Sequence, residues 1–116
     1  VSGNTIVALA SESTPYPAIT LGEMLATSDL PGGVVNIITG YKKELIPTFA
    51  THTHIRGIDA VATGDDATSL RRGAADSVKR VKVRQPDIDW SSDRAEGVYE
   101  IRHFVEFKTV WHPIGA

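Results

Sequence analysis

The chain has 116 residues, of which 41% are hydrophobic, and its formal net charge is −2 at pH 7. This length accommodates one domain with a single core. A net charge so close to zero creates no strong field for nucleic acid or for an anionic membrane surface, so neither is expected as a partner. No apolar run approaches the ~20 residues needed to cross a bilayer, and a cytoplasmic location is the default expectation.

Cysteine is absent from the sequence, which excludes disulfides and thiolate zinc sites within it. The first residue is Val1, and the only methionine is Met24. No basic stretch followed by an apolar segment opens the chain, so no signal peptide is expected. This beginning is expected of a fragment, a processed product or an excised part of a longer chain.

Strand-like and helix-like segments alternate in the first part of the chain. Residues 5–10 form a short apolar run with β-branched side chains, which predicts a strand buried on both faces. Apolar side chains at helical spacing predict a helix around residues 19–25, ended by Pro31 and the glycines after it. Residues 34–38 predict a second buried strand.

The same alternation continues toward the middle of the chain. Residues 44–51 predict a short helix with Pro47 in its first turn. Residues 55–62 predict a third strand. Gly64 and the two aspartates after it indicate a turn into a helix over residues 67–78, with the acidic side chains at the positive end of the helix dipole.

The remaining segments complete an α/β pattern. Residues 80–85 alternate valine with charged side chains, which predicts a fourth strand with one face that is exposed to solvent or lies at an edge. Residues 86–97 are polar and rich in turn residues, so a connecting loop is expected. Residues 98–111 predict a turn of helix or extended structure and then a last strand. Strands and helices that alternate at such short intervals are typical of an α/β fold with a parallel sheet covered by helices.

Three motifs together resemble aldehyde dehydrogenases. They are residues 3–15, which end in Ser13-Thr14-Pro15, residues 31–40, which begin with Pro31-Gly32-Gly33, and residues 104–111. Residues 3–83 are similar to the second through fifth strands of that family's nucleotide-binding domain, and residues 98–111 are similar to its C-terminal strand. The ending, residues 108–113, looks most like the non-catalytic C-terminal domain of family 16 aldehyde dehydrogenases.

This resemblance implies a Rossmann-like parallel sheet with flanking helices and an extra C-terminal strand. It divides the chain into a nucleotide-binding-type domain over residues 1–85, a loop over residues 86–97, and a C-terminal strand segment over residues 98–116 that serves oligomerisation. The catalytic domain, which lies between the two matching parts in the family, is missing from this sequence.

The family's catalytic groups do not carry over to this chain. Aldehyde dehydrogenases work through a thiolate nucleophile, which a chain without cysteine cannot supply. Their general-base glutamate falls on or near Arg84, and an arginine cannot accept a proton at neutral pH. No catalytic residue is therefore expected here.

The family's cofactor contacts carry over only in part. Its Lys-Pro-Ser-Glu motif corresponds to Leu9, Ala10, Ser11 and Glu12, so Ser11 and Glu12 are the residues implied near the adenosine ribose. Gly64 is the candidate for the family's glycine beside the pyrophosphate at a helix N-terminus, but the two aspartates after it oppose an anion. The expectation is that no cofactor binds, with NAD(P) at Ser11, Glu12 and Gly64 as the alternative.

Other polar groups do not indicate an active site. His52 and His54 alternate without a third ligand in view, so no metal site is expected. Asp65 and Asp66 are interpreted as favourable charges at the start of a helix rather than as paired catalytic carboxylates. The basic residues between 71 and 84 are expected in ion pairs rather than in a nucleic-acid surface.

The last predicted strand carries the candidate oligomerisation residues. Val105, Phe107, Thr109 and Trp111 share one of its faces. In the resembling family this strand joins subunits by extending a sheet of a neighbouring domain, and main-chain hydrogen bonds then supply affinity. Two interpretations stay open, because the strand either adds to another subunit or folds back on its own core. The first makes a homo-oligomer or a companion dehydrogenase domain the expected partner.

The leading hypothesis is therefore a non-catalytic aldehyde-dehydrogenase-like domain with a structural or assembly role in a larger oxidoreductase. The second hypothesis is an NAD(P)-binding module. The third is a fragment of an active NAD(P)-dependent enzyme. The replacements at Leu9 and Arg84 argue against the third, since both positions lie within the retained part of the family's fold.

Overall fold

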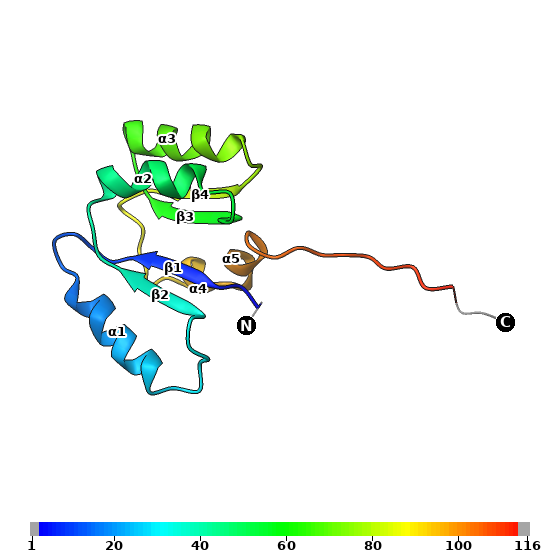
Figure 1. Ribbon diagram of the computed structural model, residues 1–116, viewed down its shortest axis with the longest axis horizontal. Coiled ribbons are helices and arrows are strands. Elements are labelled where there is room, and N and C mark those ends of the chain that lie inside the picture. The colour runs from blue at the N-terminus through cyan, green and yellow to red at the C-terminus, as the bar shows by residue number, and fades with distance from the viewer. Residues whose placement is uncertain (1–2, 114–116) are drawn as a thin grey trace.

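The computed structural model describes residues 3–113, in which short strands alternate with helices (Figure 1). The elements are β1 (Ile6–Leu9), α1 (Tyr16–Ala26), β2 (Val35–Ile38), α2 (Lys42–Thr51), β3 (Gly57–Val61), α3 (Gly64–Ala75), β4 (Arg80–Arg84), α4 (Asp93–Glu96) and α5 (Val98–Arg102). Both strand pairs are parallel. The predicted α/β fold with parallel strands and flanking helices is confirmed.

The strands form two small sheets instead of one continuous sheet. β1 pairs with β2, and β3 pairs with β4. Phe104 lies between the amino ends of the two sheets. Its carbonyl oxygen accepts a hydrogen bond from Asn4 Nδ2 at 3.0 Å, and its ring packs so closely on Gly57 that a Cβ there would come within 2.7 Å of it. The residues after α5 therefore connect the two halves of the described chain.

The best-packed region lies where α2 and α3 cover one face of the β3–β4 sheet (Figure 1). Its core consists of Ile46 and Ala50 from α2, Ile58 from β3, and Leu70 from α3. The two helices approach closely at Gly73, where an added Cβ would lie 2.7 Å from the Ala50 Cβ. Such a separation is sterically excluded, so this crossing depends on glycine.

The β1–α1–β2 unit is much more open. No residue of α1 is buried, and Ile6 and Val7 of β1 are each 51% exposed. The expectations that the first strand is buried on both faces and that the second strand is buried are therefore wrong. No residue of β1 or β2 is fully buried. A sheet of two strands, packed on α1 through β2, has too little cover to bury both of its faces.

Several boundaries differ from those predicted. Pro47 lies inside α2 and not in its first turn, because the helix begins at Lys42. The segment expected as a turn before the third helix is the first turn of α3, which begins at Gly64. The expected loop over residues 86–97 contains the short helix α4.

The predicted last strand is absent from the described residues. Residues 105–113 have no strand structure and run away from the rest of the chain (Figure 1). A strand requires a neighbour that pairs with its backbone N–H and C=O groups, and no described strand pairs with this segment. Residues 1–2 and 114–116 of the expected domains lie outside the described residues. Within residues 3–113, no helix is both long and apolar enough to cross a membrane.

One backbone position carries strain that can be tested directly. Val78, just after α3, has a φ of 52°, a conformation that costs a residue with a Cβ about 1–2 kcal/mol. Its side chain is 91% exposed, so little burial is lost on its removal. Val78→Gly is therefore expected to raise the free energy of unfolding by about 1 kcal/mol in urea titrations.

Val78→Ala is the control for this prediction, because it removes the branched side chain and keeps the Cβ. Its effect is expected to be clearly smaller than that of the glycine variant. Equal gains from both variants would show that the left-handed backbone is not the source of the strain.

Candidate functional site

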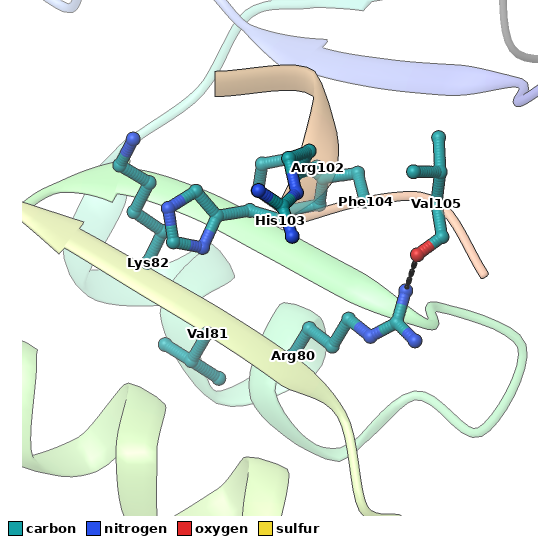
Figure 2. A pocket seen from close by; sticks show the side chains of 7 residues that line it. All are labelled: Arg80, Val81, Lys82, Arg102, His103, Phe104 and Val105. Atoms are coloured by element: carbon teal, nitrogen blue, oxygen red, sulfur yellow. Dashed lines mark hydrogen bonds between the residues drawn. The ribbon is translucent and has the colours of Figure 1, made fainter. Parts of the chain in front are cut away.

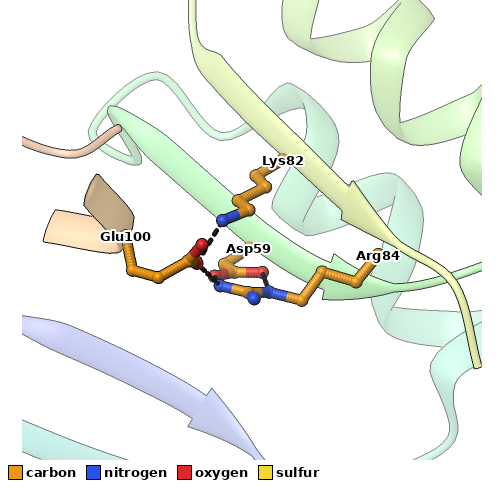
Figure 3. Close-up of polar contacts among 4 residues, drawn as sticks. All are labelled: Asp59, Lys82, Arg84 and Glu100. Atoms are coloured by element: carbon orange, nitrogen blue, oxygen red, sulfur yellow. Dashed lines mark hydrogen bonds and ion pairs between the residues drawn. The ribbon is translucent and has the colours of Figure 1, made fainter. Parts of the chain in front are cut away.

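The most developed polar site is an ion cluster that joins β3, β4 and α5 (Figure 3). Arg84 donates from Nε and Nη2 to the two carboxylate oxygens of Asp59, at 2.6 and 2.5 Å. The same Nη2 donates to Glu100 Oε2 at 2.5 Å, and Lys82 Nζ also pairs with Glu100. A bidentate arginine–carboxylate pair of this kind is a strong and geometrically specific contact. We call Asp59, Lys82, Arg84 and Glu100 the ion cluster.

Strand periodicity places the cations of this cluster on one face. Arg80, Lys82 and Arg84 alternate along β4 with Val81, which packs against the core. The cations therefore lie on the face opposite α2 and α3. Parallel pairing sets Asp59 beside Lys82, within reach of Arg84.

Arg84 is the most enclosed member of the ion cluster. Its side chain is only 9% exposed, and its guanidinium carbon lies 5.3 Å from the centre of the Trp90 ring, a distance at which a cation is attracted to an aromatic face. The hydrogen bonds to Asp59, and then those to Glu100, raise the pKa of Arg84 further, although burial opposes them. Arg84 is therefore a fixed cation.

The ion cluster also holds α5 against the sheet in a pH-dependent way. The pKa of Glu100 is lowered, first by its hydrogen bond to Lys82 and then by that to Arg84. A carboxylate whose pKa is lower in the folded chain stabilises the fold above its unfolded pKa. The contribution of Glu100 is therefore present at neutral pH and is lost as the pH falls through its folded pKa.

The predicted ribose residues lie together on the loop between β1 and α1. Ser11 Oγ accepts hydrogen bonds from the backbone N–H of Thr14 at 3.3 Å and from the Thr14 hydroxyl at 3.1 Å. The Glu12 carboxylate accepts a hydrogen bond from the backbone N–H of Lys42, the first residue of α2. A carboxylate at a helix N-terminus is favoured by the helix dipole, so Glu12 stabilises the start of α2.

The predicted pyrophosphate residue lies in the other sheet unit. Gly64 is the first residue of α3 and follows β3, whereas Ser11 and Glu12 follow β1. Its φ of 55° is readily adopted only by glycine. Asp65 and Asp66 occupy the first turn of α3, where they complement the helix dipole as expected.

The candidate oligomerisation residues lie on the segment after α5. Phe107 and Trp111 are 83% and 87% exposed, and Thr109 is exposed as well. Val105 is half-buried, and its carbonyl oxygen accepts a hydrogen bond from Arg80 Nη1 at 2.7 Å. The two aromatic side chains thus have no substantial cover within the described chain.

Sequence reasoning identified Arg84 but missed its partners in the ion cluster. Alternation along β4 predicted that the charged side chains share a face that is exposed or lies at an edge. Instead of facing solvent, Arg84 is only 9% exposed there. Asp59 is 25 residues from Arg84, and Glu100 is 16 residues from it. No local spacing rule connects them.

In the described part of the chain, no three His, Cys, Asp or Glu side chains are grouped so that they could hold a metal ion, and His52 and His54 have ring centres 5.8 Å apart.

Comparisons with known proteins give a consistent result. The family model described as the aldehyde dehydrogenase family matches residues 1–85. The chain is 28% identical over 81 residues to a hydroxyisobutyraldehyde dehydrogenase of Mycolicibacterium austroafricanum, covering 70% of this chain and 16% of the relative. It is 31% identical over 80 residues to a 2-hydroxymuconic semialdehyde dehydrogenase of Pseudomonas sp. (strain CF600), covering 68% of this chain and 16% of the relative. The chain thus spans about a sixth of the length of these curated relatives, and no solved structure matches it.

Proposed function

Because the chain belongs to the aldehyde dehydrogenase family, we propose that it forms a non-catalytic domain with a structural or assembly role in a larger oxidoreductase. The placement that fits best is that of the C-terminal domain of family 16 enzymes, to which residues 108–113 are similar. The family's thiolate nucleophile has no counterpart here, since the sequence contains no cysteine.

The observation that carries this proposal is the environment of Arg84. The family resemblance implies that the general-base glutamate corresponds to this position or one near it, where a carboxylate would have to accept a proton. Arg84 instead donates to Asp59 and Glu100, and its raised pKa keeps it a cation. A side chain that ties a strand to a helix in this way has a structural role and no capacity for proton abstraction.

The residues at the nucleotide position do not fit NAD(P), the cofactor that the family resemblance implies. The Glu12 carboxylate is engaged at the N-terminus of α2, and Leu9 offers no donor to a ribose. Asp65 and Asp66 would face a pyrophosphate at the start of α3 and repel it. We therefore propose that this chain holds no nucleotide on its own.

Titration of the isotope-labelled chain with NAD tests this point. The expected result is no saturable change in its amide resonances at millimolar NAD, because the required donors are replaced or engaged. Saturation in the micromolar range that is weakened by Glu12→Gln would contradict the proposal and favour an NAD(P)-binding module.

The assembly role is proposed for Val105, Phe107, Thr109 and Trp111. The high exposure of Phe107 and Trp111 supports it, because large aromatic side chains gain most from cover by a second surface. The backbone of residues 105–113 has no strand partner in the described chain. Addition of this segment to the sheet of another subunit or companion domain would cover the aromatic side chains and would pair the backbone N–H and C=O groups of the segment.

Phe107→Asp and Trp111→Asp are expected to convert an oligomer into a monomer of 12.5 kDa, measured by light scattering after gel filtration. The physical reason is that a buried, unpaired carboxylate in a strand–strand interface is strongly unfavourable. Lys108→Asp is the matched control, because it places the same carboxylate on the opposite face of the segment and should leave the mass unchanged.

Two outcomes would contradict this assembly proposal. If the aspartate variants lose their helical circular dichroism, the segment belongs to the core of its own chain. If they keep both their dichroism and their oligomeric mass, other residues form the interface.

A further inference from the structure

A depression of about 390 Å³ lies between β4 and the residues that end α5 and follow it (Figure 2). Its lining residues are Arg80, Val81, Lys82, Arg102, His103, Phe104 and Val105. Four of the seven are basic and none is acidic. These basic side chains are concentrated in a chain whose net charge is −2. Arg80 and Lys82 are each paired with a glutamate, Glu106 and Glu100, that does not line the depression.

This depression is separate from the position where the family resemblance implies a nucleotide. Arg80 and Lys82 are the first and third residues of β4, so the depression lies toward the amino end of that strand. Ser11, Glu12 and Gly64 instead follow the carboxyl ends of β1 and β3. The two positions therefore lie at opposite ends of the strands.

We propose that the depression binds the terminal phosphate group of a small anionic molecule, a group that NAD does not carry. Apart from the Lys82 ammonium, which pairs with Glu100, two guanidinium groups and an imidazole offer more donors than the two oxygens of a single carboxylate can use, whereas a phosphate presents three or four acceptor oxygens. Arginine in particular matches phosphate through its planar, forked donors.

Two of the basic groups have internal partners that a ligand would have to share. Arg80 donates to the Val105 carbonyl at 2.7 Å and lies 3.4 Å from Glu106, while Lys82 pairs with Glu100. The Arg80–Glu106 pair is largely exposed, and pairs of this type contribute little to stability. Glu106 therefore acts as a weak competitor that a phosphate can displace.

Arg102 is the residue best placed to report on the ligand. It is exposed, its guanidinium carbon lies 5.9 Å from the centre of the Tyr99 ring, and it is not part of the ion cluster. Its replacement should therefore reduce binding without releasing α5. His103, next to it in the lining, offers a second position for the same purpose.

The test is calorimetric titration of the full chain with inorganic pyrophosphate at low ionic strength, where charge interactions are least screened. Arg102→Gln is expected to weaken binding about tenfold. Arg71→Gln, which removes the same charge from an exposed position of α3, is expected to change it less than about twofold. Glu106→Gln is expected to tighten binding, because it removes the internal competitor.

Three results would overturn the proposal. One is the absence of saturable binding at millimolar pyrophosphate. Another is equal weakening by Arg102→Gln and Arg71→Gln, which would reveal a response to net charge alone. The third is binding to vesicles that contain a phosphoinositide but none to free pyrophosphate, which would assign the basic residues to a lipid surface. If Arg102→Gln does not fold, His103→Gln takes its place in the same comparison.

Discussion

Arg84→Gln is expected to lower the free energy of unfolding by about 2 kcal/mol, measured in urea. The substitution leaves Asp59 and Glu100 without the cation that both of them contact. Removing one partner of a fully buried ion pair costs about 3–5 kcal/mol. The cost should be smaller here, because the Asp59 and Glu100 side chains are 35% and 24% exposed and can regain part of their hydration.

The same substitution should loosen α5, because Glu100 then keeps only Lys82 as a partner in the ion cluster. Amide hydrogen exchange should therefore accelerate more in α5 than in α3. Arg71→Gln is the control, since Arg71 is an exposed arginine of α3, and its effect on stability should stay within about 0.5 kcal/mol. Equal losses in both variants would show that Arg84 contributes only to the net charge.

Leu70→Ala should produce the largest loss of stability, about 3 kcal/mol in the same measurement. Leu70 is 2% exposed and is the largest fully buried side chain among the described residues. It contacts the cluster formed with Ile46, Ala50 and Ile58. Its truncation removes buried apolar surface and leaves a cavity that helices held at a close crossing cannot easily fill.

Leu21→Ala provides the matched comparison, because it makes the same chemical change in α1. Leu21 is 49% exposed, so its truncation should cost less than about 1 kcal/mol. A similar loss from both variants would contradict the conclusion that the stable core of the chain lies in α2, α3 and the β3–β4 sheet. It would also imply that another surface covers α1 in solution.

The terminal segment shows why a strand is difficult to predict from residue types alone. Residues 104–111 have the β-branched and aromatic side chains that favour strands. In the described chain they form none, because a strand is stable only when a neighbour pairs with its backbone. Helices differ in this respect, since their hydrogen bonds lie within the segment itself, and α1 was predicted close to its observed position.

Glu12 was singled out from the sequence, but its contact in the structure was not predicted. Its place after the first strand was predicted correctly, because the end of an apolar run is a local feature. Its partner, the backbone N–H of Lys42, is 30 residues away. The hydrogen bond between Glu12 and the start of α2 therefore depends on the tertiary fold, which places the N-terminus of α2 next to the loop after β1. No local sequence pattern predicts this placement.

The sequence by itself determined the α/β class, the membership of the aldehyde dehydrogenase family and the lack of a thiol nucleophile. The α/β class depends on residue types and on spacings of two to four positions, which the chain displays directly. Family membership rests on the match over residues 1–85, and the lack of a thiol follows from the absence of cysteine. Only the tertiary structure decided that Arg84 is enclosed by Asp59, Glu100 and Trp90 and that four basic residues line one depression. Those contacts join segments far apart along the chain, and packing of the sheet and of α5 brings them together.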